Sequence, residues 1–307
     1  MTTGTIGVGG GIRAGWQGKL KVMKRPAVLL VLAAIVSVQV GSAIARTLFD
    51  DLGAAGITLL RLAIAAVVIA VAIRPDVRHW SREAWRAAAA LGVVMAAMNL
   101  IFYLSLRTVP LGIAVTVEFL GPLLLALVQT RRLLDLLWAL LAAGGVVLLG
   151  VMGGGSAPLG GLALAFVAGL CWAAYIVFSA RLGAVVPGTG GLAVSLAVAA
   201  VLVLPFGASG ASAVLDKPFL LLGGTAVALL SSVFSYGLEI NALRRIPTRV
   251  FGILMSLEPA AAALAGLLVL GQRLGARELV ALVLVSTASL GVTLGRREGQ
   301  PPVAPLE

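Results

Sequence analysis

Ten apolar runs, each close to the length of a membrane span, alternate with short polar segments along this chain. They cover residues 26–45, 56–73, 84–106, 110–129, 133–152, 160–180, 189–206, 218–243, 247–270 and 277–294. About twenty apolar residues in an α-helix cross the hydrocarbon core of a bilayer. The runs are unbroken, whereas the strands of an outer-membrane barrel alternate and are half as long. The sequence therefore predicts an all-α membrane protein with ten transmembrane helices, because a helix satisfies its own backbone groups in lipid.

One short pattern of residues occurs twice. Residues 106–110, Leu-Arg-Thr-Val-Pro, recur at 243–247 as Leu-Arg-Arg-Ile-Pro, and a second proline follows each copy at the same spacing, at Pro122 and Pro259. Each copy holds five predicted spans, so the second enters the membrane from the opposite side. We therefore expect two inverted five-helix repeats, an arrangement typical of transporters that work by alternating access. The two expected repeats cover residues 26–152 and 160–294.

Composition and charge agree with this topology. Hydrophobic residues make up 60% of the 307 residues and charged ones only 11%, too few charges for a soluble domain of this size. With the N-terminus inside, 17 of the 23 Lys and Arg residues fall in inside segments and five in outside segments. The net charge of +11 follows this topology, so we expect no nucleic-acid partner. The prediction is a multi-pass protein of the inner (plasma) membrane with cytoplasmic tails at 1–25 and 295–307.

Two glutamates interrupt the apolar runs near their middles, Glu118 in 110–129 and Glu258 in 247–270. An ionised carboxylate at this depth costs about 2.5–3.5 kcal/mol, so each needs a partner, a wet cavity or a proton. When the two prolines are aligned, the glutamates differ by nearly one helical turn and share a face. We expect both to face a central cavity and to bind a substrate ammonium or an exchanging proton. The alternative is that they only hold helices together.

The prolines that follow these glutamates have a consequence of their own. Pro122 and Pro259 lack an N–H, so the carbonyls of Glu118 and Met255 lose their helical donors. Such carbonyls are tolerated where they line a cavity or find another donor. The alternative, equally open from the sequence, is that each proline only kinks its helix and has no role in binding. By contrast, Pro110 and Pro247 stand where helices are expected to begin, a position that favours proline.

Other polar residues at similar depth complete the candidate site. Neutral groups that can bind the substrate carboxylate or hydroxyl, or hold helices together, are Asn99, Tyr103, Ser235 and Tyr236, with Ser231 and Ser232 nearby. Arg61 is expected about one turn inside the outer end of its span. We expect it to reach to the membrane interface or to pair with Asp50 or Asp51, in preference to binding substrate. Glu239 is expected near the inner end of its span, paired with Arg244 or Arg245 or at the interface.

Several function classes lack their motifs. The chain has no GxxxxGK[ST] phosphate loop and no HExxH zinc motif, and its single histidine, His79, is placed in a loop. Every aspartate lies at the end of a predicted span or in a loop, so an intramembrane aspartyl protease is not expected. We therefore predict neither an enzyme nor a resident metal or cofactor, but a secondary transporter driven by an ion gradient.

Four segments carry a resemblance to a known family. They are 108–115, 118–123 with Glu118-Phe119 and Gly121-Pro122, 171–176, and 247–260 with Glu258-Pro259-Ala260. The chain resembles the EamA family of the drug/metabolite transporter superfamily, most closely its RhtA-type threonine/homoserine exporters. The resemblance implies a proton-driven exporter of threonine, homoserine and related small amino acids in the inner membrane. A transporter of another small solute, such as a nucleotide sugar, drug or polyamine, is the alternative.

One position departs from that family. The family often has Gly-Glu after the ninth span, whereas this chain has Gly271-Gln272. The difference removes one possible proton or cation site, and so leaves open which ion is coupled to transport.

Overall fold

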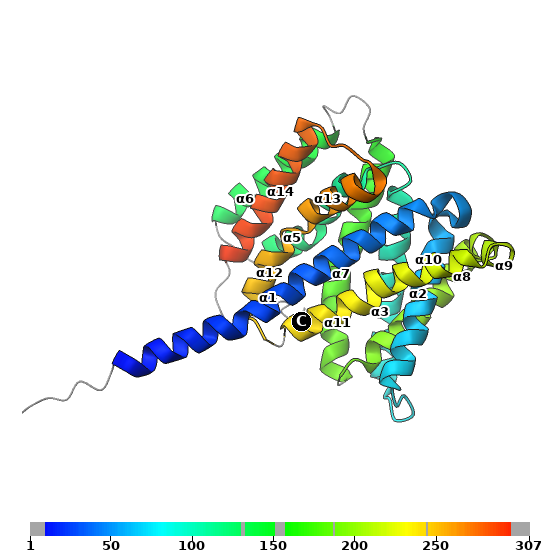
Figure 1. The fold of residues 1–307 in the computed structure, drawn as a ribbon, viewed down its shortest axis with the longest axis horizontal. Coiled ribbons are helices and arrows are strands. Elements are labelled where there is room, and N and C mark those ends of the chain that lie inside the picture. The colour runs from blue at the N-terminus through cyan, green and yellow to red at the C-terminus, as the bar shows by residue number, and fades with distance from the viewer. Residues whose placement is uncertain (1–9, 130–132, 151–156, 187, 244, 296–307) are drawn as a thin grey trace, which may run out of the picture.

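The computed structural model describes residues 10–129, 133–150, 157–186, 188–243 and 245–295 (Figure 1). These residues form helices and connecting segments with no strand among them, which confirms the all-α class. Nine helical stretches within these ranges are long and apolar enough to cross a bilayer, and a shorter apolar helix, Leu136–Leu149, lies in the fifth predicted run. The segments 1–9 and 296–307 of the expected tails lie outside the described residues.

The helices follow the predicted runs in order. They are α1 (Gly10–Thr47), α2 (Phe49–Ile73), α3 (Arg82–Ser105), α4 (Leu111–Glu118), α5 (Leu120–Gln129), α6 (Leu133–Gly150), α7 (Leu159–Val185), α8 (Gly190–Ala211), α9 (Ala213–Asp216), α10 (Phe219–Ala228), the π-helix η1 (Leu229–Phe234), α11 (Ser235–Leu243), α12 (Thr248–Met255), α13 (Glu258–Leu270) and α14 (Ala276–Gly295). Because α1 begins at Gly10, residues 10–25 are helical, although the sequence suggested a tail there.

Local sequence explains where several helices begin. The side chain of Ser81 accepts a hydrogen bond from the Ala84 N–H and so caps α3. Pro110 stands immediately before α4 and Pro247 immediately before α12, which confirms the expectation that these prolines start helices. Proline suits this position because its missing N–H would have no intrahelical acceptor there.

Two of the predicted spans are broken into two helices. The fourth predicted span, 110–129, consists of α4 and α5, with the break at Phe119. The ninth, 247–270, consists of α12 and α13, with the break at Ser256 and Leu257. Each break lies three residues before a proline, Pro122 or Pro259. The prolines therefore do interrupt their helices, and they do so at matching places in the two copies of the sequence pattern.

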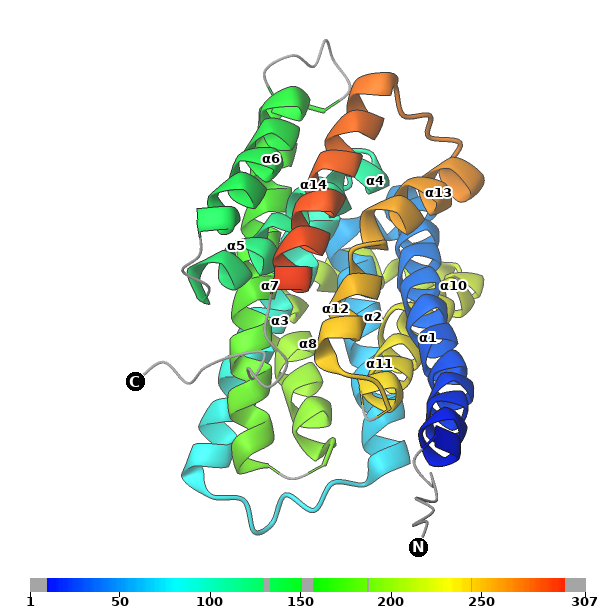
Figure 2. The ribbon, with the colours of Figure 1, turned by 90° about the vertical axis from the view of Figure 1, so that its left-hand side faces the viewer.

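The long helices run roughly parallel between the two ends of the molecule (Figure 2). The most extensive helix packing joins α2 with α8, α3 with α7, α6 with α14, and α3 with α8, while α1 packs on α11 and α13 and α4 packs along α13. Glycines permit the closest approaches. An added Cβ at Gly56 would lie 2.9 Å from the Ala211 nitrogen in α8, and one at Gly291 would overlap the Trp138 ring of α6.

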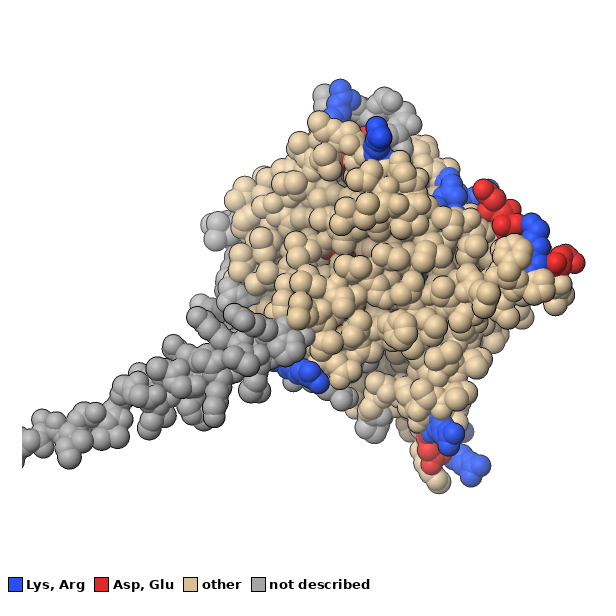
Figure 3. Space-filling view, viewed as in Figure 1, with Lys and Arg blue, Asp and Glu red and all other residues tan. Residues whose placement is uncertain are grey.

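The outer surface suits a lipid environment. Charged side chains gather toward the margins of the face in Figure 3, and a wide band of other residues lies between them. Large apolar side chains point outward around the bundle, including Val128 at 79% exposure and Leu222 at 75%. A soluble protein rarely leaves so many large apolar groups in water, so this surface fits a bilayer.

Candidate functional site

Glu118 is the last residue of α4 and lies at the first helix break. Its side chain is only partly buried, although residues 111–117 before it and 119–121 after it are all buried. Glu118 is thus the one residue of this stretch whose surface is not fully covered by neighbouring helices. That it faces a central cavity stays a prediction.

Glu258 is the first residue of α13, at the second helix break. Only 6% of it is exposed, and it forms no salt bridge with a described residue. The N-terminal end of a helix carries partial positive charge, which favours a carboxylate at this position. Its charge interacts with those of Glu118 and Glu239, so three acidic side chains from different helices share one region.

Arg61 is not at the membrane surface, and that expectation was wrong. It is 6% exposed and lies in α2 (Phe49–Ile73), well after the kink at Gly53, where it is enclosed by neighbouring helices. Its guanidinium donates hydrogen bonds to the Tyr103 hydroxyl, the Ser232 hydroxyl and the Ser231 carbonyl, at 3.0, 3.1 and 2.9 Å. The expected outer partner Asp51 instead pairs with Lys217.

The four neutral candidates separate into two pairs. Tyr103 is fully buried and its hydroxyl accepts the bond from Arg61, while Tyr236 is partly buried and interacts electrostatically with Arg61 and Glu239. Asn99 donates to the Met95 carbonyl at 2.8 Å, and Ser235 donates to the Ser231 carbonyl at 3.1 Å. The two tyrosines thus join the charged groups, whereas Asn99 and Ser235 are bonded within their own span.

Glu239 and Tyr175 belong to the same region, which the sequence did not indicate. Glu239 lies in α11 and is partly buried. It interacts electrostatically with Glu258 and Tyr175, and so belongs with the buried polar groups. Arg244, one of its two expected partners, lies outside the described residues, and Glu239 forms no salt bridge with Arg245 among the described ones. Tyr175 of α7 also interacts with Tyr236, so α7 and α11 face each other across this region.

The π-helix η1 supplies backbone acceptors to the same region. Its wider turns leave carbonyls without helical donors, and these find side-chain donors instead. The Leu230 carbonyl accepts from the Ser37 hydroxyl at 2.7 Å, and the Ser231 carbonyl accepts from Arg61. Adjacent serines at 231 and 232 were the only local signal, and serine pairs occur in many ordinary membrane helices.

A close helix crossing fixes the position of Glu118. The carbonyl oxygen of Glu118 lies against Gly169 of α7, where an added Cβ would overlap it, and a Cβ on Gly121 would overlap the Gly169 carbonyl. Phe119 packs edge-on against Trp172 one turn further along α7, with ring centroids 5.4 Å apart. The carbonyl that Pro122 deprives of its helical donor is therefore enclosed by α7.

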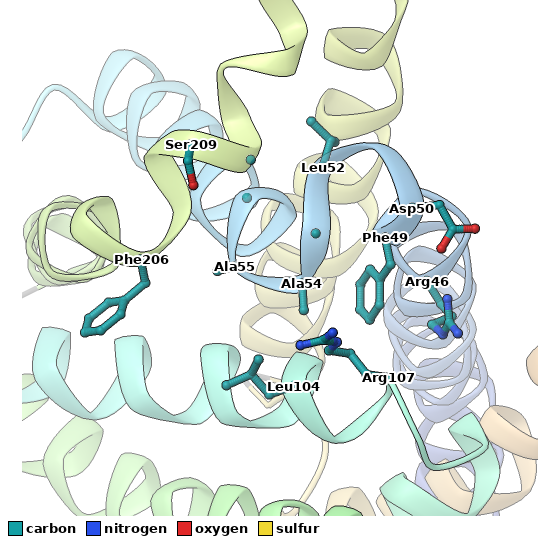
Figure 4. Close-up of a pocket in the computed structure, with 13 residues that line it drawn as sticks. Arg46, Phe49, Asp50, Leu52, Ala54, Ala55, Leu104, Arg107, Phe206 and Ser209 are labelled. Carbon is teal, nitrogen blue, oxygen red and sulfur yellow. The ribbon is translucent and has the colours of Figure 1, made fainter.

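A pocket of about 470 Å³ opens at one end of the bundle, near the turn between α1 and α2 (Figure 4). Arg107 extends into it from the end of α3, beside Phe49, and Arg46 and Asp50 lie at its edge (Figure 4). None of the predicted site residues lines this pocket. It is therefore a separate feature from the group of charged residues at the helix breaks.

At the same end of the bundle, Gln272 joins α4 to the segment after α13. Its Oε1 accepts a hydrogen bond from the Leu111 N–H at 2.9 Å, so a side chain 161 residues away caps α4. Beside it, Gly112 packs so closely on Ala263 that an added Cβ would lie 2.8 Å from the Ala263 Cα. The glutamine that replaces the family's expected glutamate therefore has a structural role here.

Replacing Gln272 provides a direct test of this cap. Gln272→Ala is expected to destabilise the protein by about 1–3 kcal/mol, because the Leu111 N–H loses its acceptor in a partly buried place. Gln272→Glu keeps an oxygen there and adds a negative charge at a helix N-terminus, so it should retain stability. Thermal unfolding of both purified variants measures the difference, and an alanine variant as stable as the wild type would contradict the role.

No group of three or more His, Cys, Asp or Glu side chains among the described residues is placed to hold a metal ion. The chemistry that the region offers is instead that of binding. It combines acidic groups, one guanidinium and tyrosine hydroxyls inside a bundle of apolar helices. Such a set suits a small ligand that carries both charges.

Comparisons with known proteins identify the family. Residues 159–294 match the EamA-like transporter family. The chain is 42% identical over 276 residues to the threonine/homoserine exporter RhtA of Salmonella typhimurium, covering 89% of this chain and 93% of that protein. It is 41% identical over 273 residues to the protein of the same name in Escherichia coli K12, covering 88% and 92%. A protein of known crystal structure, 22% identical, shares the fold with a TM-score of 0.55 over 88% of this chain and 98% of its own. The chain therefore belongs to the EamA-like transporter family.

Proposed function

We propose that this protein exports threonine, homoserine and related small amino acids across the inner membrane by secondary active transport. The observation that carries the proposal is the identity of 41–42% to two proteins named threonine/homoserine exporter, over about nine-tenths of the chain. The acids at the helix breaks and the nearby Arg61 support it independently, because an amino acid carries an ammonium and a carboxylate. Transport of such a ligand requires groups of both signs near the middle of the bundle.

The proposed architecture is a pair of inverted repeats, 26–152 and 160–294, with both termini in the cytoplasm. Matching helix breaks three residues before Pro122 and Pro259 support the repeat. The helix packing also fits this symmetry. α1 of the first half packs on η1 and α11 of the second half, and α7, the counterpart of α1, packs on α3 of the first half. The excess of Lys and Arg on one side of the predicted topology supports the orientation.

The two halves differ in one contact that such symmetry relates. α4 packs along α13, whereas α5 and α12, the corresponding pair, do not pack along each other among the described residues. In the proposed orientation the first pair lies toward the outside and the second toward the cytoplasm. We therefore interpret the structure as closed to the outside and accessible from the cytoplasm. The partial exposure of every residue from Cys171 to Ser179 supports a space beside α7 on that side.

In the proposed cycle, an amino acid enters from the cytoplasm and its ammonium binds between Glu118 and Glu258. The halves then rock, so that α4 and α13 separate while α5 and α12 come together. Protons from outside then neutralise the two carboxylates, one each, and the ammonium leaves. The protonated protein returns and releases these protons to the cytoplasm. The acids thus bind the substrate and the proton in turn, which links one flux to the other.

A polyamine is the second candidate substrate. Three acidic side chains, those of Glu118, Glu239 and Glu258, interact in one region, and such a group also attracts a ligand with several positive charges. Arg61 works against this, because its positive charge lies near Glu118. The same set of charges disfavours a nucleotide sugar with its two negative phosphates.

Counterflow by purified protein in proteoliposomes tests the substrate. Vesicles loaded with unlabelled solute are diluted into labelled threonine, and only a transported solute drives uptake of the label. Threonine and homoserine inside are expected to give strong uptake, while spermidine or a nucleotide sugar gives none. A protein that exchanges spermidine but not threonine would replace the proposal with the polyamine transporter.

A further inference from the structure

The guanidinium of Arg61 is a buried positive charge that lacks a contacting counter-ion. It is 6% exposed, and no carboxylate of a described residue lies within salt-bridge distance. All three of its hydrogen-bond acceptors, on Tyr103, Ser231 and Ser232, are uncharged. A buried charge without a direct ion pair is costly, so its presence points to a role in binding an anionic group.

The bonding pattern leaves two N–H groups of this guanidinium unused among the described residues. Arginine has five N–H groups: one on Nε and two on each terminal nitrogen. Nε–H is used by the Ser232 hydroxyl, one Nη1–H by Tyr103 and one Nη2–H by the Ser231 carbonyl. Among the described residues, one N–H on each terminal nitrogen therefore remains without an acceptor. These two groups are donors that the oxygens of a carboxylate accept.

The surroundings fix the arginine in place for such a partner. Its three bonds reach α3 and η1 from α2, and its guanidinium also lies over the Tyr103 ring, 5.5 Å from the centroid. Pre-organised donors lose little conformational entropy when a ligand binds. The positive charge also acts on Glu118, so groups of opposite sign lie in one region at a distance greater than a direct salt bridge.

We propose that Arg61 binds the carboxylate of the transported amino acid, while the acidic residues bind its ammonium. This rests on the proposed function and deepens it, because it names the group that separates amino acids from simple amines. The two-point arrangement selects α-amino acids and rejects ligands with only positive charge. A purely structural Arg61, which ties three helices together, would not discriminate between ligands with and without a carboxylate.

The test compares threonine with threoninol, which has an alcohol in place of the carboxylate, as inhibitors of labelled threonine counterflow. In wild-type protein, threonine is expected to inhibit about 10- to 100-fold more strongly than threoninol, the range for hydrogen bonds to a charged group. Arg61→Gln should weaken inhibition by threonine by that factor and leave inhibition by threoninol unchanged. The ratio of the two should therefore approach one.

The controls separate binding from folding. Arg181→Gln removes an exposed arginine at the end of α7 and is expected to keep the wild-type ratio. A weakening of both ligands by the same factor in Arg61→Gln would overturn the assignment in favour of a structural role. If that variant does not fold, the wild-type comparison decides, and equal inhibition by threonine and threoninol overturns the proposal.

Failure of the proposed function would look different. Wild-type protein would then show no threonine counterflow at all. In that case the role of Arg61 is tested by the thermal stabilisation of the protein by a panel of carboxylates and their amides. Stabilisation by carboxylates alone, lost in Arg61→Gln, supports the assignment. Equal or absent stabilisation by both kinds of compound overturns it.

Discussion

Glu258→Gln and Glu118→Gln are each expected to reduce proton-driven threonine flux by about 100-fold, the loss of roughly two charge-assisted bonds in a buried site. Glutamine has nearly the shape of glutamate but neither holds an ammonium by charge nor carries a proton. Because Glu258 is almost completely buried, its variant should show the larger loss. The measurement is labelled threonine flux into proteoliposomes under an imposed pH gradient, at equal amounts of folded protein.

A matched control accompanies these two variants. Glu83 lies in the first turn of α3 and is exposed, so Glu83→Gln should retain wild-type flux. Threonine counterflow without a pH gradient then separates the two roles of the acids. A variant that exchanges threonine but does not respond to the gradient has lost proton coupling. A variant that does neither has lost substrate binding. Wild-type flux in both variants would remove these acids from the mechanism.

Gly169→Ala is expected to abolish transport and to destabilise the protein by about 1–3 kcal/mol or more. The added methyl group would overlap the carbonyl oxygen of Glu118, which is backbone and cannot rotate away. Helices α4 and α7 would have to separate, and Glu118 would move with α4. Thermal unfolding of the purified variant gives the loss of stability, and threonine counterflow gives the loss of transport.

The same helix offers the control for this variant. Gly183 also lies in α7, but an added Cβ there would meet no other atom within 4 Å. Gly183→Ala should therefore be neutral or slightly stabilising, because alanine favours a helix more than glycine does. An alanine at 169 that unfolds no earlier than one at 183 would show that the crossing of α4 and α7 is looser than described.

Local patterns in the sequence were sufficient for the helical class and for the two helix breaks. Apolar runs of about twenty residues identify spans because every part of a span must satisfy the same bilayer. Pro122 and Pro259 identify the breaks because a missing N–H acts within one turn of its own helix. Glu118 and Glu258 stand out for a similar reason, since an acid at this depth is costly wherever its partners lie.

The depth of Arg61 could not be predicted in this way. The apolar run begins at residue 56, but α2 begins at Phe49 and includes Asp50 and Asp51 in its first turn. These acids lie in a helical turn before Gly53, where φ is +66°, a conformation that favours glycine, and the chain kinks there. Arg61 follows that kink by about two helical turns. Its burial comes from the neighbouring helices that pack around it, which the apolar run does not reveal.

The partners of Arg61 and Glu239 depend on tertiary packing, which no local pattern encodes. The acceptors of Arg61 come from α3 and η1, and those in η1 are 170 and 171 residues away in the chain. The π-helix itself has no signature in the letters Leu-Leu-Ser-Ser-Val-Phe, since its extra width is stabilised by donors from other helices. Only the arrangement of the whole bundle brings these groups together.

An experimental structure of the protein with bound threonine tests the central claim most directly. We expect the ammonium of threonine between Glu118 and Glu258 and its carboxylate on the guanidinium of Arg61, inside the bundle. Threonine bound instead in the pocket beside Arg46 and Arg107, with no density near the helix breaks, would contradict the proposed site.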